Sequence, residues 1–180
     1  MRLLSLDFDG VLHPGNDPVF FNFKPTTPMF QIDLAMRTQK RFLWADRLAE
    51  TLTGSDVQIV IHSTWRRRFS DRDLLHFLPE EIAHRVINLD GVISERVNLS
   101  ADEYVAAAAE ALEPVDLCVL DDRPEFFPAD GLTAAWIAQH GGDFVWAKPM
   151  LGLSDLSTLE RLSGWINAVA PQQHSLPTQH

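Results

Sequence analysis

The sequence has little of several residues that particular kinds of site and environment require. Cys118 is its one cysteine, so no disulfide can form within the chain, and we expect a reducing, cytoplasmic environment. This cysteine and the seven histidines lack the spacing of a zinc site. The sequence contains neither an apolar run of about 18 residues nor a charged and then apolar leader. We therefore expect no membrane span and no secretory signal.

Basic residues are also scarce. The chain has 15 Lys and Arg against 25 Asp and Glu, which gives a formal net charge of -10. This charge argues against strong binding of duplex nucleic acid by bulk attraction, although it allows a local basic patch. The 180 residues, 46% of them hydrophobic, are enough for one globular domain with a sizeable core. We expect this domain to span residues 1–170 and residues 171–180 to form a flexible tail.

Predicted strands alternate with predicted helices along the chain. Apolar runs predict strands at residues 3–8, 57–61, 116–120 and 143–147, with a weaker one at 85–92. Apolar spacing and capping patterns predict helices at residues 39–53, 70–78, 100–112, 133–139 and 154–169. The proline-rich segment 13–36 is expected to form a flap. The alternation predicts an α/β three-layer sandwich with a doubly wound, mostly parallel sheet and no large cap.

Three of the predicted strands end in polar residues. Asp7 and Asp9 follow the first, Ser63 follows the second, and Asp121 with Asp122 follows the third. In open parallel sheets, ligands bind beyond the carboxyl ends of the strands, so we expect these side chains to meet in one site. The alternative for the first stretch is an Asp-Gly hairpin turn.

The spacing of the first pair also points to a cation. Residues two apart in a strand face the same side, so extended geometry would bring the carboxylates of Asp7 and Asp9 close together. Two like charges this close favour a hard divalent ion with oxygen ligands. Gly10 then allows a sharp turn or a close approach to a ligand.

Phosphoryl transfer through a carboxylate is the chemistry that fits this set of residues. One aspartate can attack phosphorus, and a neighbouring one can protonate the leaving oxygen and later accept a proton from water. Magnesium offsets the charge between carboxylate and phosphate, while a hydroxyl and a Lys or Arg hold the phosphate oxygens. The sequence thus predicts a magnesium-dependent enzyme acting on a phosphorylated substrate.

The stretch from Asp7 to Val11 resembles the first motif of the haloacid dehalogenase (HAD) superfamily, Asp-x-Asp-Gly-Val, without a mismatch. The resemblance implies that Asp7 is the nucleophile and Asp9 the general acid and base, whose backbone carbonyl also binds the metal. An aspartate at the second position implies phosphatase rather than dehalogenase chemistry. Ser63 corresponds to the second motif, with Thr64 as a weaker candidate.

The fourth motif of the superfamily is an acidic pair, and Asp121 and Asp122 correspond to it. By analogy Asp122 is the direct magnesium ligand and Asp121 acts through water or from the second shell. The third motif departs from the pattern, because it is usually a lysine and the sequence has none between Lys40 and Lys148. Arg96 is the favoured cation by its order in the chain, and Lys148 is the alternative.

Within the superfamily, three stretches resemble a small capless group related to HAD domains of RNA-repair proteins. They are Ser63 to Arg66, Leu120 to Pro124 and Gly152 to Ser154. The acidic pair with its following arginine also resembles polynucleotide 3′-phosphatase domains. A capless site is expected to be open, so a nucleic-acid end or a phosphoprotein is a candidate substrate, as is a small metabolite.

Several cations and histidines near these motifs have two interpretations. Arg66, with Arg67 and Arg68, could bind a substrate phosphate or form a solvated face, and Arg123 could touch substrate or pair with the acidic motif. We interpret His13 as a loop residue and His62 as structural. Two functions follow: a magnesium-dependent phosphatase that forms an aspartyl-phosphate intermediate, or a non-catalytic HAD-like domain that binds a phosphorylated partner.

Overall fold

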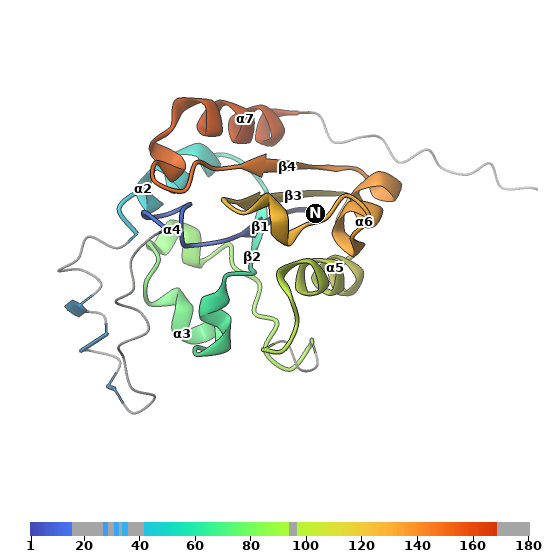
Figure 1. Ribbon diagram of the computed structural model, residues 1–180. Helices are drawn as coiled ribbons and strands as arrows, with labels where there is room; N and C mark the ends of the chain where they lie inside the picture. The colour runs from blue at the N-terminus through green and yellow to red at the C-terminus, as the bar shows by residue number, and fades with distance from the viewer. Residues whose placement is uncertain (16–26, 29–30, 33, 36–41, 94–96, 169–180) are drawn as a thin grey trace, which may run out of the picture.

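A computed structural model describes residues 1–15, 27–28, 31–32, 34–35, 42–93 and 97–168. Its centre is a sheet of four parallel strands in the order β2-β1-β3-β4 (Figure 1). The strands are β1 (Arg2–Leu6), β2 (Gln58–Ile61), β3 (Asp116–Asp121) and β4 (Gly142–Trp146). The predicted α/β fold with a parallel sheet is therefore confirmed.

Helices cover both faces of this sheet. They are α2 (Ala45–Leu52), α3 (Asp71–Leu75), α4 (Glu80–Ala83), α5 (Ala101–Leu112), α6 (Leu132–His140) and α7 (Leu156–Asn167). Short 3-10 turns occur at η2 (Thr64–Arg67), η3 (Pro124–Phe126) and η4 (Gly152–Ser154). Helices α2 and α7 lie on one face, and α5 and α6 on the other (Figure 1).

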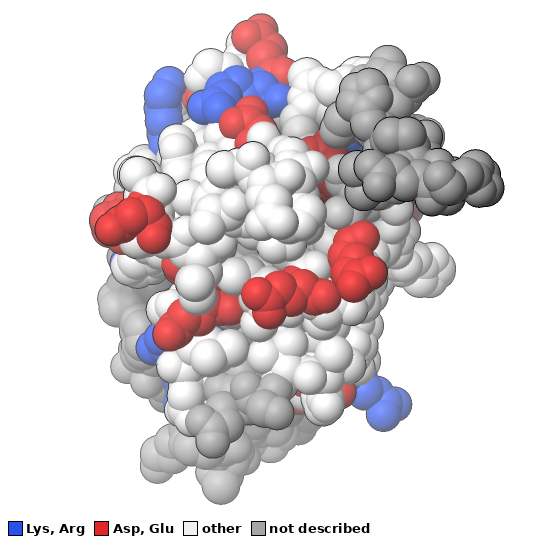
Figure 2. Space-filling model, turned by 90° about the vertical axis from the view of Figure 1, so that its right-hand side faces the viewer, with Lys and Arg blue, Asp and Glu red and all other residues white. Residues whose placement is uncertain are grey.

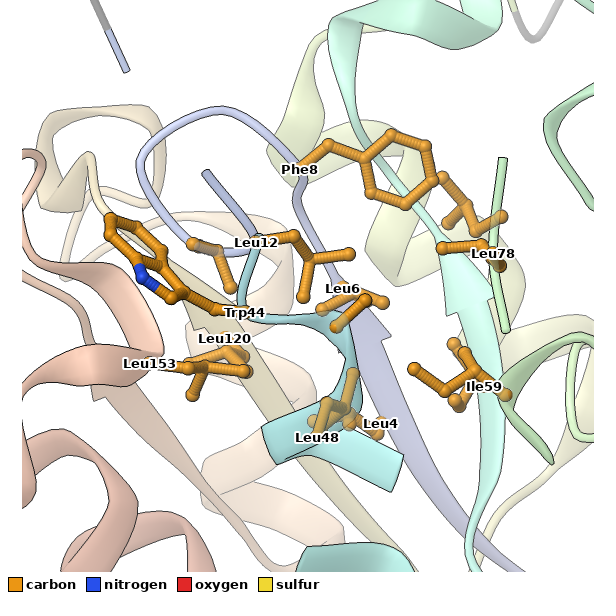
Figure 3. Close-up of a cluster of buried hydrophobic side chains, with 14 of the residues drawn as sticks. Leu4, Leu6, Phe8, Leu12, Trp44, Leu48, Ile59, Leu78, Leu120 and Leu153 are labelled. Carbon is orange, nitrogen blue, oxygen red and sulfur yellow. The ribbon is translucent and has the colours of Figure 1, made fainter. Parts of the chain in front are cut away.

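The central strands carry buried apolar side chains on both faces because helices cover each face of the sheet. Leu4 and Leu6 of β1 belong to one core cluster, which includes Leu48 of α2 (Figure 3). Leu3 belongs to the opposite cluster together with Tyr104 of α5. This two-sided burial is the arrangement that continuous apolar runs in parallel strands require.

Local sequence signals explain where several helices begin and end. Ser70 and Ser100 each form the predicted capping box, at the start of α3 and α5. Helix α5 ends at Leu112, after which Glu113 adopts a left-handed conformation with φ 45°. Helix α2 is shorter than predicted: it begins at Ala45, while residues 39–41 of the predicted helix lie outside the described residues.

The segment 85–92 differs from the weak prediction of a strand. It makes one isolated bridge, between Ile59 and Val86, and does not extend the sheet. Most of the predicted flap at 13–36 and all of the predicted tail at 171–180 lie outside the described residues. In the described part of the chain, no helix has the length and apolar character needed to cross a bilayer.

The strand order reverses between β1 and β3. The chain passes from β1 to β2 on one side, and then returns to β3 and β4 on the other. At the carboxyl ends of this central pair, the Asp7 amide donates to the Leu120 carbonyl at 3.0 Å. This is the position where ligands bind in open α/β sheets, and the first and fourth motifs lie side by side there.

Candidate active site

Three carboxylates meet beyond the ends of β1 and β3. Asp7, Asp121 and Asp122 are buried, and each offers an oxygen within 4.8 Å of the others. The Asp9 carboxylate does not belong to this cluster. The structure thus brings together the carboxylates of three of the four residues predicted at the metal, and the fourth, Asp9, is expected to bind it through its backbone carbonyl.

The carboxylates are held where their charges are poorly compensated. Burial, followed by the charges of Asp121 and Asp9, raises the pKa of Asp7 well above its ordinary value. The nearby Ser63 hydroxyl opposes this shift, although it makes no hydrogen bond of normal geometry within the described residues. Burial and the charge of Asp121 raise the pKa of Asp122 to about 6, with Arg123 acting in the opposite direction.

This cluster fits a divalent cation with oxygen ligands. Oδ1 of Asp122 is buried and has no hydrogen-bond partner among the described residues. Both oxygens of Asp121 already accept hydrogen bonds, from the Arg123 amide at 2.7 Å and from His62 Nε2 at 2.8 Å. The unpartnered oxygen of Asp122 is consequently the better placed direct ligand, and a cation would relieve the mutual repulsion of the cluster.

Gly10 lets the backbone pack against this cluster. Its φ is +73°, and a Cβ built on it would lie 2.0 Å from Oδ2 of Asp122. The amides of Val11 and Leu12 both donate to the Phe8 carbonyl, so a tight turn follows β1 instead of a hairpin strand. The glycine is required by a positive φ and by contact with a metal-site carboxylate.

The Asp9 carboxylate is held by two side chains from outside the first motif. His13 Nε2 lies 2.9 Å from Oδ1, and Trp65 Nε1 donates to Oδ2 at 2.9 Å. The side chain of Asp9 is 29% exposed and lines a cavity, whereas His13 is fully buried. The interpretation of His13 as only a loop residue is therefore incomplete, because its buried ring contacts Asp9. Its one sequence signal is its position four residues after Asp9.

His62, directly before the second motif, connects the fourth motif to strand β1. Its Nε2 lies 2.8 Å from Oδ2 of Asp121, and its Nδ1 lies 2.8 Å from the hydroxyl of Ser5 in β1. With its proton on Nε2, the ring donates to Asp121 and accepts from Ser5. His62 therefore orients a carboxylate of the cluster, beyond the structural role that its sequence position indicated. Its one signal in the sequence is its place directly before Ser63.

The run after β2 sends its side chains in different directions. Ser63 is buried beside Asp7, while Thr64 is exposed and lines the cavity. Arg66 is buried, and its guanidinium donates to the carbonyls of His62 and Leu99. It also lies over the Tyr104 ring, 4.7 Å from the ring centroid. Arg66 thus fastens the turn to the start of α5, and much of its donor capacity is used by the protein itself.

A cavity of about 500 Å³ lies in front of the carboxylates. Asp7, Asp9 and Asp121 line its acidic side, and several arginines are also part of its lining: Arg66, Arg67, Arg68 and Arg123. Arg67 and Arg68 are exposed at its surface. The face at the α5 and α6 end has a different charge distribution: Figure 2 shows a band of acidic side chains on it, with basic ones toward its margins. The cavity therefore combines a carboxylate floor with a cationic wall.

The remaining predicted cations lie in different surroundings. Arg123 is half-exposed, and its Nε lies 3.8 Å from Oδ1 of Asp122. Lys148 follows β4, but its ammonium lies 2.7 Å from Asp155, the N-cap residue of α7, and it does not line the cavity. Arg96, the favoured third-motif cation, lies outside the described residues.

The comparisons with known proteins agree with the motifs. Residues 3–157 match the family model described as "HAD domain in Swiss Army Knife RNA repair proteins". No curated protein and no solved structure was found to match the chain. The match includes every described side chain of the site and supports a phosphatase-like function of the HAD type, with a divalent metal as is typical of the superfamily. The chain belongs to this family of HAD domains.

Proposed function

We propose that the protein hydrolyses a phosphate monoester, with Asp7 as nucleophile and Mg²⁺ held by Asp7, Asp122 and the backbone carbonyl of Asp9. Asp121 supports the site from the second shell. The observation that carries this proposal is the buried cluster of Asp7, Asp121 and Asp122 at one end of a cavity whose wall is cationic. When bound, Mg²⁺ would offset the negative charge between carboxylate and phosphate.

Asp7 and Asp9 divide the chemistry between them. An oxygen of Asp7 forms a bond to phosphorus as the bond to the ester oxygen breaks, and Asp9 gives its proton to that leaving oxygen. Water then attacks the aspartyl phosphate while Asp9 accepts a proton. Phosphate leaves and the Asp7 carboxylate is restored. The Ser63 hydroxyl, beside Asp7 and without a partner of normal geometry among the described residues, is available to a phosphate oxygen.

A phosphorylated nucleic-acid end is the substrate class that the cavity favours. Arg67, Arg68 and Arg123 lie on its wall, where they can bind a second phosphate next to the one that reacts. Thr64 adds a hydroxyl to the same wall. The family description, which refers to RNA repair proteins, supports a substrate of this kind.

The test is turnover of a phosphate panel by the full chain. The panel contains a generic aryl phosphate, a small alkyl phosphate and 3′-phosphorylated oligonucleotides, each with Mg²⁺ and with EDTA. We expect turnover that requires Mg²⁺, is lost in Asp7→Asn and is retained in the control Asp143→Asn, whose carboxylate is exposed and pairs with Arg161. Tight binding of phosphorylated ligands without turnover of any of them would refute the enzyme and favour the non-catalytic domain.

A further inference from the structure

The surroundings of Asp9 carry an inference that goes deeper into the proposed function. The carboxylate lies between an indole and an imidazole that come from two different turns of the chain. Trp65 is in η2, after β2, and its Nε1 donates to Oδ2 at 2.9 Å. His13 comes from the turn after β1, and its Nε2 lies 2.9 Å from Oδ1.

Each oxygen of the Asp9 carboxylate therefore has one hydrogen-bond partner: Trp65 for Oδ2 and His13 for Oδ1. A carboxylate offers about four lone-pair positions, so two hydrogen bonds fix its plane and leave a free position on each oxygen. Asp9 lines the cavity and is partly exposed, so the remaining positions are accessible from that side. This is the arrangement that a proton donor and acceptor needs, because its orientation is set before substrate arrives.

The two donors are themselves held rigidly. Trp65 and His13 are both fully buried, and both pack against the ring of Phe42 with centroids 5.4 Å and 5.1 Å away. The backbone adds to this, because the Gly10 amide donates to the His13 carbonyl at 2.8 Å. Neither ring can turn away from Asp9 without disturbing the aromatic cluster around it.

The imidazole is oriented for donation to Asp9. Its Nδ1 is buried and has no hydrogen-bond partner among the described residues. A proton on Nε2 lets the ring donate to Asp9 and leaves a lone pair at Nδ1, which is less costly than an unpartnered N–H. The His13 imidazole then has one hydrogen-bond partner in the described part of the protein, and that partner is Asp9.

We infer that Trp65 and His13 are positioning residues for the general acid and base, and that they act on the leaving-group step through Asp9. This inference rests on the proposed function. It assigns no contact with substrate to either ring. Its specific consequence is that their loss matters most where the leaving oxygen needs a proton.

The experiment compares two leaving groups in the variant Trp65→Phe, which keeps an aromatic ring in the cluster and removes the donor. The value of kcat/KM reports transfer of the phosphoryl group to Asp7, before water enters. For an alkyl phosphate, whose leaving oxygen must be protonated, we expect kcat/KM to fall about ten- to a hundredfold, the range for a hydrogen bond to a charged group. For 4-nitrophenyl phosphate, which leaves readily as an anion, we expect a fall of less than about threefold, since general acid catalysis contributes little there.

Two controls keep the result specific. Trp165→Phe makes the same chemical change at a buried tryptophan whose Nε1 has no hydrogen-bond partner in the described chain. It should leave kcat/KM unchanged for both substrates. His13→Gln retains an N–H donor and His13→Met removes it, so the Gln variant should preserve the alkyl rate better than the Met variant. If Trp65→Phe does not fold, the two His13 variants still test the positioning role.

Each outcome bears on a different claim. An equal loss for both leaving groups, or no difference between His13→Gln and His13→Met, would overturn the positioning role while leaving the phosphatase intact. A wild-type protein that turns over neither substrate would overturn the proposed function and this inference with it.

Discussion

Removal of one buried charge is expected to stabilise the metal-free protein. The pKa of Asp122 is raised from its ordinary 3.8 to about 6, first by burial and then by Asp121. Below about pH 4 the group is protonated in both the folded and the unfolded chain. Between about pH 4 and 6 the unfolded chain loses the proton first, so the free energy of unfolding falls as pH rises, and above about pH 6 the penalty is constant.

The size of this effect follows from the shift. About two pKa units correspond to about 3 kcal/mol, since each unit is worth about 1.4 kcal/mol. In EDTA at pH 7.5, Asp122→Asn should therefore unfold at a higher temperature than the wild type, by up to about 6–12 °C for a chain of this size. This shift already includes the opposing charge of the half-exposed Arg123, whose Nε lies 3.8 Å from the carboxylate.

Magnesium should make the wild type more stable to heat than Asp122→Asn, the reverse of the order in EDTA. A cation at 1,000 times its dissociation constant adds about 4.1 kcal/mol to the wild type, which exceeds the penalty of about 3 kcal/mol, whereas the amide binds it poorly. Thermal unfolding at pH 4 and 7.5, each with EDTA and with Mg²⁺, measures both effects. Asp143→Asn is the control and should move little, because its carboxylate is exposed. An Asp122→Asn protein that is less stable than the wild type by the same amount at both pH values in EDTA would refute this account of the cluster.

Three further predictions concern neighbouring residues. Gly10→Ala should destabilise the protein by more than about 2 kcal/mol, because the new Cβ would collide with Asp122. Gly54→Ala is the control: its φ of +77° is similar, but nothing lies within 4 Å of the new Cβ, so it should cost only the backbone strain of about 1 kcal/mol. Denaturant unfolding measures both variants, and equal losses of stability would exclude the collision. His62→Phe should weaken Mg²⁺ binding about ten- to a hundredfold, because Asp121 loses a hydrogen bond that orients its carboxylate. Calorimetry measures the affinity. His84 is exposed, so the control His84→Gln should bind Mg²⁺ as the wild type does. Arg96→Gln should lower kcat more than Lys148→Gln, since the Lys148 ammonium is bound to Asp155; the opposite ranking would make Lys148 the phosphate-binding cation.

The sequence predicted the sheet and the meeting of its motifs because both depend on regular patterns. Apolar runs buried on two sides mark parallel strands, and β1 and β3 lie where those runs indicated. The general rule for ligands in open sheets then brings Asp7 next to Asp121 without any knowledge of side-chain contacts. Capping boxes predicted the starts of α3 and α5 for an equally local reason.

The failures concern segments whose structure depends on distant partners. Residues 85–92 have strand-like composition, yet β2 accepts only an isolated bridge from them, at Val86. The arginine run after β2 looks like a solvated face, but Arg66 is buried because carbonyls at His62 and Leu99 take its N–H groups. The sequence of the arginine run does not reveal these carbonyl partners, and that of Leu99 lies 33 residues away in the chain.

The run from Ser63 to Arg66 shows why the site needs more than its carboxylates. A 3-10 turn has about three residues each turn, so consecutive side chains leave it in different directions. Ser63 reaches Asp7, Thr64 faces the cavity, Trp65 donates to Asp9, and Arg66 ties the turn to the residues that precede α5. The proposed nucleophile and the proposed proton donor are thus both contacted by a turn whose own position is set by Arg66. Loosening this arginine should therefore disturb both steps of the reaction together, whereas loss of Trp65 should disturb proton transfer alone.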